Sequence, residues 1–214
     1  MNLHPYDWWE DDGRPKPATP EIERRLLAAL KGAPSHPAAL HYWIHLQESS
    51  ARPARAAAEA DRLRHLVPGS PHLTHMPAHI DMRTGRYAEA VAASERAIEA
   101  DRAYLAQVDA QGAYRVGYAA HNHHFLWAAA AMQGRSALAI ESARQAYLVA
   151  CGPVANDLST ATLQHHAALH LYSLVRFARW DEILRGTLPP DTSEPYPLAV
   201  FHFARGVAWA RTGE

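Results

Sequence analysis

The chain has 214 residues, and its apolar fraction of 48% is enough to pack helices against one another. Its 21 Lys and Arg residues nearly balance its 22 Asp and Glu residues, so nothing in the composition suggests the basic face that nucleic acid or an anionic membrane demands, and we expect neither as a partner. The single cysteine, Cys151, excludes an intramolecular disulfide and a multi-cysteine zinc site. Histidine, with 15 residues, is unusually frequent.

No segment has the pattern of a signal peptide or a transmembrane helix. The N-terminus lacks an apolar core, and the longest apolar run, Phe125 to Met132, is too short to span a bilayer. We therefore expect a soluble, cytoplasmic protein.

The N-terminal part predicts a loop followed by one helix. Residues 1–18 are acidic and rich in proline, and we expect Trp8 and Trp9 in this loop to dock on the first helix pair. Thr19-Pro20-Glu21 predicts a helix start with a hydroxyl cap, a first-turn proline and an acid near the positive end of the dipole. The helix should end at Gly32. Because no helix precedes it, residues 19–32 are interpreted as an orphan helix of an incomplete repeat.

A turn pattern recurs along the rest of the chain, and each turn is expected to join two antiparallel helices. The turn positions are Ala51, Gly85, Gly134, Ala178 and Gly213. Two of the four spacings are 34 and 35 residues, and the other two are longer. Around the second turn the sequence is Gly85-x-Tyr87-x-x-Ala90, followed by Ala97 and Ile98, small and apolar residues that let the second helix pack on the first.

This pattern resembles the tetratricopeptide repeat (TPR), a helix-turn-helix unit of about 34 residues. The resemblance implies an all-α, right-handed α-solenoid of antiparallel helix pairs over residues 34–214. Its units would be residues 35–69, 70–102, 119–150 and 161–188, with a partial unit at 196–214. Because an orphan helix stands at each end, we expect a segment of a longer solenoid or a clipped version of one. A histidine-rich bacterial subset of the family is similar in the stretches His41 to Glu48, His72 to Tyr87 and Tyr118 to Trp127.

The turn alignment also brings histidines into register. Ten residues before a turn lie His41, His75 and His124; six before lie His45 and His79; thirteen before lie His72, His121 and His165; Glu48 lies three before the first turn. These offsets differ by three or four residues, so they mark one face of each first helix. The resemblance implies that this face lines the concave groove.

Two of these first helices carry a metal-binding spacing. His41-x-x-x-His45 and His75-x-x-x-His79 each place two imidazoles on one face, and neighbouring helices about 8–10 Å apart let such imidazoles converge. We therefore predict a transition metal (zinc, copper, nickel or iron) held by ligands drawn from His41, His45, His75, His79, His121 and His124. The predicted groove-lining residues are Glu48, His72, Tyr114, Arg115, Tyr118 and His165, with Glu48 a further candidate ligand. His166 and His170 fall off this face and should pack between helices.

Pro77 leaves the course of one helix open. If the helix begins at Ser70-Pro71, Pro77 lies inside it and kinks it; if the helix begins near Met76, Pro77 is an ordinary first-turn proline. In both cases the backbone near His75 is irregular.

Two functions remain open, and whether the protein is an enzyme is undecided. The sequence has no glycine-rich phosphate loop, so no nucleotide cofactor is expected, and it has no standard catalytic motif. The first hypothesis is metal-dependent hydrolysis or oxidation of a small molecule or peptide. The second is a non-enzymatic TPR scaffold that binds a peptide or protein partner in the same groove.

Overall fold

The computed structural model describes residue 1 and residues 6–108, 114–151, 161–186 and 194–213. Within these ranges the chain is helical and forms no strand, apart from an isolated bridge between Trp9 and Pro15. The all-α prediction is therefore confirmed. The chain divides into two units, Met1–Tyr104 and Leu105–Glu214. Among the described helices, none combines the length and apolarity needed to cross a membrane.

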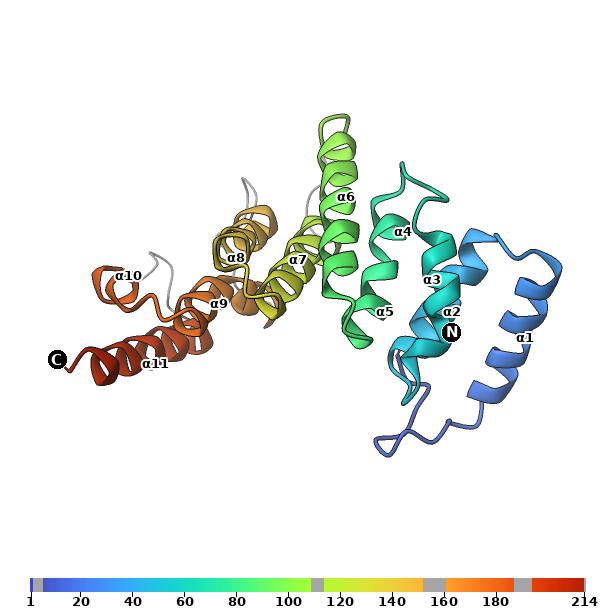
Figure 1. Cartoon of the computed structure of the whole chain (residues 1–214), viewed down its shortest axis with the longest axis horizontal. Helices are drawn as coiled ribbons and strands as arrows, with labels where there is room; N and C mark the ends of the chain where they lie inside the picture. The colour runs from blue at the N-terminus through green and yellow to red at the C-terminus, as the bar shows by residue number, and fades with distance from the viewer. Residues whose placement is uncertain (2–5, 109–113, 152–160, 187–193, 214) are drawn as a thin grey trace. The chain divides into compact units, whose positions relative to one another are not determined.

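The first unit is built of helices connected by short turns (Figure 1). Its elements are α1 (Thr19–Gly32), α2 (Pro37–Glu48), the short 3-10 turn η1 (Pro53–Ala56), α3 (Ala57–Leu63), α4 (Pro71–His75), α5 (Pro77–Arg83) and α6 (Tyr87–Leu105). Helix α2 is central, because it packs against α1, α3 and α5. Its apolar residues Leu40, Ile44 and Leu46 are fully buried.

The N-terminal loop docks on this core as predicted. The Trp8 side chain is 5% exposed and belongs to the same apolar cluster as Leu40. The Trp9 indole N–H donates a hydrogen bond to the backbone oxygen of Leu46 at 2.8 Å. The predicted hydroxyl cap of α1 is wrong: Ala18 occupies the cap position, and the Thr19 hydroxyl donates to the Trp8 backbone oxygen instead. The Thr19 hydroxyl thus forms its hydrogen bond with the docked loop and does not cap the helix.

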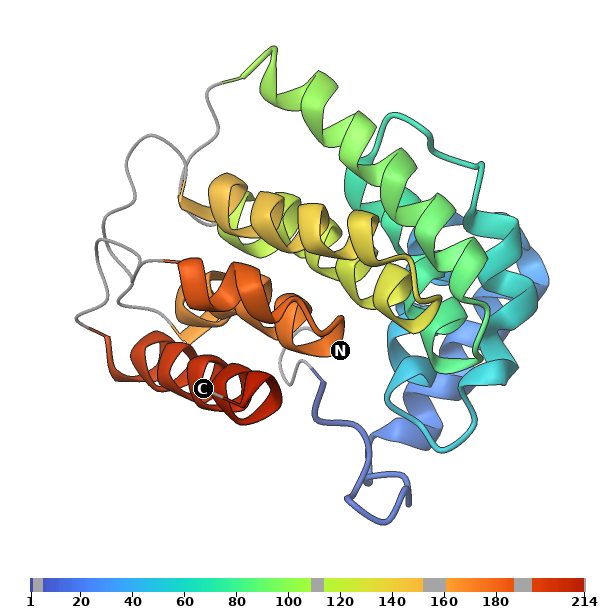
Figure 2. The same ribbon diagram turned by 60° about the vertical axis from the view of Figure 1, so that its left-hand side comes forward.

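The second unit consists of further antiparallel helices, shown from another side in Figure 2. Its elements are a single π-helical turn η2 (Arg115–Ala119), α7 (Ala120–Met132), α8 (Ser136–Cys151), α9 (Ala161–Arg176), α10 (Trp180–Arg185) and α11 (Pro195–Thr212). Helix α7 packs against α8, α8 against α9, and both α9 and α10 against α11. The small residues Ala143 and Ala146 let α8 approach Leu169 of α9 closely.

Three of the predicted turns share one backbone geometry. Gly85, Gly134 and Ala178 have φ angles of 77°, 71° and 54°. After each, the next amide donates to the carbonyl five residues earlier: Arg86 to Asp81, Arg135 to Ala130 and Arg179 to Leu174, at 2.8–3.0 Å. This is the Schellman helix ending, which a left-handed residue makes possible. The three turn positions are confirmed, whereas the stacking of the pairs into a superhelix stays a prediction.

Candidate metal centre

Two helical segments of the first unit supply a cluster of five histidines and one glutamate. Helix α2 carries His41, His45 and Glu48 on one face, since these residues are spaced by four and three. The α4–α5 segment carries the other three histidines, which are His72, His75 and His79. Helix α5 packs against α2, so the two polar faces meet inside the unit.

Pro77 bends the second of these segments. The helix that begins at Pro71 is interrupted at Met76, whose backbone keeps helical angles, and it resumes at Pro77. Proline has no N–H to donate to the preceding turn, and the His79 amide donates to the Met76 oxygen only three residues back, at 3.2 Å. Each alternative from the sequence is thus met in part: the segment is helical from Pro71, and Pro77 stands in the first turn of α5.

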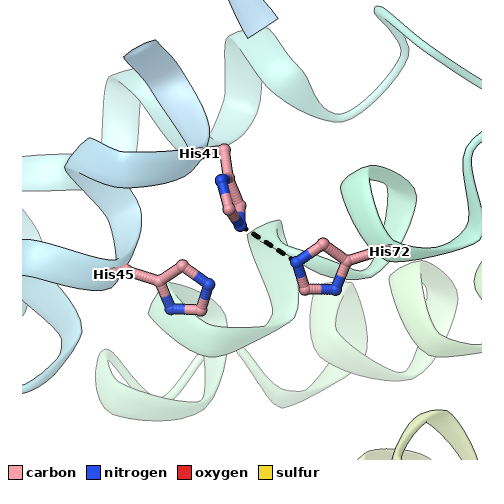
Figure 3. Close-up of side chains that lie close together, drawn as sticks. All are labelled: His41, His45 and His72. Carbon is pink, nitrogen blue, oxygen red and sulfur yellow. Dashed lines mark hydrogen bonds between the residues drawn. The ribbon is translucent and has the colours of Figure 1, made fainter. Parts of the chain in front are cut away.

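Three of the histidines converge on one point (Figure 3). The Nε2 atoms of His41 and His72 lie 2.9 Å apart, and one ring nitrogen of His45 faces this pair. One ring nitrogen from each of the three residues lies within 4.8 Å of the other two. His72 was predicted to line the groove, and the structure instead makes it a member of the candidate ligand set.

Glu48 connects this triad to the remaining two histidines. Its Oε1 accepts a hydrogen bond from Nδ1 of His45 at 2.6 Å, and its Oε2 accepts one from Nδ1 of His79. Both carboxylate oxygens are thus engaged by imidazoles. The structure places Glu48 as the group that orients two histidines, and not with an oxygen free to bind an ion.

The charge state of Glu48 fixes the tautomers of its neighbours. Burial opposes its ionisation, but the hydrogen bonds from His45 and His79 outweigh burial and hold the pKa of the carboxyl at about 2. An ionised carboxylate can only accept, so both histidines carry a proton on Nδ1. In the neutral rings the lone pair then lies on Nε2, the nitrogen that binds a metal. A carboxylate behind a ligand histidine is the usual support of such sites.

Burial also keeps the neighbouring rings unprotonated. It lowers the pKa of His41 to about 3 and of His72 to about 4, and repulsion from the adjacent imidazoles acts in the same direction. A metal binds only the neutral imidazole, and protonation would compete with it. At neutral pH a metal therefore meets His41 and His72 as neutral imidazoles and does not have to compete with their charged form.

His75 extends the cluster beyond Glu48. Its Nε2 lies 3.0 Å from Nε2 of His79, and the two residues are 1% and 8% exposed.

Tyr6 of the N-terminal loop packs edge-on against His45, with the ring centroids 5.5 Å apart. No periodicity in the sequence could have indicated Tyr6, because it lies in a loop and not on a repeated helix face.

The remaining predicted site residues belong to the second unit. His124 of α7 lies near His165 and His166 of α9, with ring centroids 5.2 and 5.8 Å away. Burial lowers the pKa of His124 and of His166 to about 4. His166 is buried as predicted, and its proximity to His124 was not foreseen. His121 lies on the same face of α7 and packs against Phe125, with the ring centroids 4.7 Å apart.

The predicted groove residues of the 103–120 insertion cluster around the π-helical turn. Tyr114 and Tyr118 have ring centroids 5.7 Å apart, Arg115 begins the turn between them, and Tyr118 is exposed. Their convergence with the five histidines of the first unit stays a prediction.

Comparisons with known proteins add no assignment. No protein-family model matches the sequence, and no curated protein matches it. The functional interpretation therefore depends on the geometry of the histidine cluster.

Proposed function

We propose that the first unit binds a transition-metal ion through Nε2 of His41, His45 and His72. The observation that carries the proposal is the convergence of three imidazole nitrogens within 4.8 Å of one another. Two further features support it: Glu48 directs the lone pair of His45, and burial keeps His41 and His72 neutral. Such a set of ligands costs stability when unoccupied, because buried polar groups are desolvated without full compensation.

The ligand set indicates which ions to test first. Imidazole nitrogens suit zinc, copper, nickel and iron, and affinity for a given site peaks at copper. Three histidines leave a fourth position for water or substrate, which is the arrangement of catalytic sites. A zinc ion there would lower the pKa of bound water and support hydrolysis, whereas copper or iron would support oxidation of a small molecule or peptide.

The alternative is a TPR-like scaffold that binds a peptide or protein partner. The observation that favours it is the Schellman closure shared by the turns at Gly85, Gly134 and Ala178, which is compatible with a repeated helix pair. In this alternative the polar face of α2 and α4–α5 hydrogen-bonds a partner and needs no ion.

Metal analysis separates the two functions. Purified, untagged protein would be dialysed against a chelator, loaded with Zn²⁺ or Cu²⁺, desalted and measured by plasma mass spectrometry. The double variant His41→Ala/His72→Ala should lose the ion of the triad while keeping its helical circular dichroism. The matched control is His65→Ala, an exposed histidine of the same unit. A wild-type protein that takes up no added ion would overturn the metal proposal and leave the scaffold.

A further inference from the structure

We infer that the first unit binds a second divalent transition-metal ion, zinc or copper, between the Nε2 atoms of His75 and His79. The inference rests on the proposed function, because it adds a second position to the same cluster. Glu48 stands between the two positions, with His45 on one side of its carboxylate and His79 on the other.

The hydrogen bond from His79 to Glu48 determines where the lone pair of His79 lies. Nδ1 of His79 donates to Glu48, so the lone pair of the neutral ring lies on Nε2 and points away from the carboxylate. The atom found there is Nε2 of His75, at 3.0 Å. In the metal-free protein His75 must therefore donate its Nε2 proton to His79. A cation placed between the rings would take the position of this proton.

The distance between the two nitrogens is that of two ligands on one ion. Two nitrogens bound to one ion at about 2.05 Å are about 2.9 Å apart at a right angle and about 3.3 Å apart at the tetrahedral angle. The distance of 3.0 Å between Nε2 of His75 and Nε2 of His79 lies in this interval. The corresponding distance of 2.9 Å between His41 and His72 lies at the lower end of the interval. Both nitrogen pairs can thus close on an ion with only small side-chain movements.

The two positions share the carboxylate of Glu48. His45 and His79 donate to different oxygens of Glu48, and their ring centroids lie 5.5 Å apart. Each oxygen orients one ligand histidine and raises its basicity. Glu48 therefore orients one ligand histidine for each ion, and the two histidines lie on opposite sides of its carboxylate.

The two positions should differ in affinity. The first has three protein ligands in this unit, whereas the second has two. We expect the ions to bind in sequence, the first tightly and the second more weakly. The shared Glu48 makes both affinities depend on one residue.

The experiment is a calorimetric titration of metal-free protein with Zn²⁺, checked by native mass spectrometry. Wild type should bind two ions in two phases. His75→Phe, which keeps a ring of similar size but offers no ligand, should lose only the weaker phase; His41→Ala/His72→Ala should lose only the tighter one. His65→Ala should keep both. Circular dichroism confirms that each variant is folded, and His79→Gln serves as a second test should His75→Phe unfold.

The outcomes separate the two proposals. One bound ion that His75→Phe leaves unchanged would overturn the second position and leave the triad standing. No bound ion in wild type would overturn both. Loss of both phases in His75→Phe, in a folded variant, would contradict two separable positions.

Discussion

At the scale of single residues, Glu48 has the largest effect on the proposed centre. In Glu48→Gln one of the two acceptors becomes an amide NH₂, which cannot accept the Nδ1 proton of its histidine. That ring must change tautomer or turn away, and its Nε2 lone pair is no longer directed at an ion. We expect zinc affinity to fall by about 10–100-fold, the usual effect of losing such a support. Isothermal titration measures it.

The control for this substitution is Glu89→Gln, which changes an exposed glutamate of α6 in the same unit. It removes the same charge and should leave zinc affinity unchanged. Equal affinities for Glu48→Gln and wild type would show that the carboxylate does not orient the ligands.

A second residue, Asp81, is expected to control the stability of the first unit. Its side chain is fully buried and lies 2.5 Å from Nη2 of Arg86 and 3.0 Å from Nη2 of Arg64. In Asp81→Ala the side chain of Arg64, which is 12% exposed, loses its buried counter-charge. We expect a loss of about 3 kcal/mol in the free energy of unfolding, measured with urea. Asp61→Ala, which removes a half-exposed partner of the same arginines, should cost about 1 kcal/mol or less.

At the scale of helices and turns, Ala178 provides a test of the turn geometry. It holds the left-handed position at φ 54° that glycine holds in the other two turns. A side chain in this conformation costs about 1–2 kcal/mol. Ala178→Gly should therefore raise the free energy of unfolding by about 0.5–1 kcal/mol, after the larger entropy of an unfolded glycine is subtracted.

Gly134→Ala, in the same unit, should change stability in the opposite direction. An added Cβ at Gly134 meets no atom within 4 Å, so its effect is that of the backbone alone. We expect a loss of about 1 kcal/mol. Thermal or urea unfolding measures the stability of both variants. If both substitutions change stability in the same direction, the explanation that Ala178 is strained is contradicted.

The sequence predicts these turns because their signal is local. Glycine, or alanine in one of the three turns, recurs at a fixed distance from the polar and apolar residues around it. Helix periodicity likewise places His41, His45 and Glu48 on one face. What could not be predicted depends on packing between helices. The pairing of His41 with His72 joins two helices 31 residues apart in the sequence, and a carboxylate shared by His45 and His79 requires the packing of α5 on α2. The Thr19 cap failed for the same reason, because a distant tryptophan loop competes for the hydroxyl.

At the scale of the whole molecule, both units bury histidines that stay neutral, so the metal-free protein should lose stability in mild acid. Burial lowers the pKa to about 3 for His41 and about 4 for His72, His124 and His166, from an ordinary value of 6.5. The unfolded chain binds protons at these residues below pH 6.5, whereas the folded chain binds them only near pH 3–4. Stability is thus full above pH 6.5 and falls as the pH decreases below it.

The carboxylates do not produce the same effect in this range. The lowered pKa of Glu21, to about 2 through Arg24 and Arg25, removes stability only when the pH falls below its ordinary value of 4.5. Between pH 6.5 and 4.5 the histidines therefore account for the change. Melting temperatures of the chelated protein at pH 7, 6 and 5 should decrease in that order, and His41→Gln should make the decrease shallower, since glutamine does not titrate. A melting temperature that is flat or rises towards pH 5 would show that the buried histidines are not held neutral.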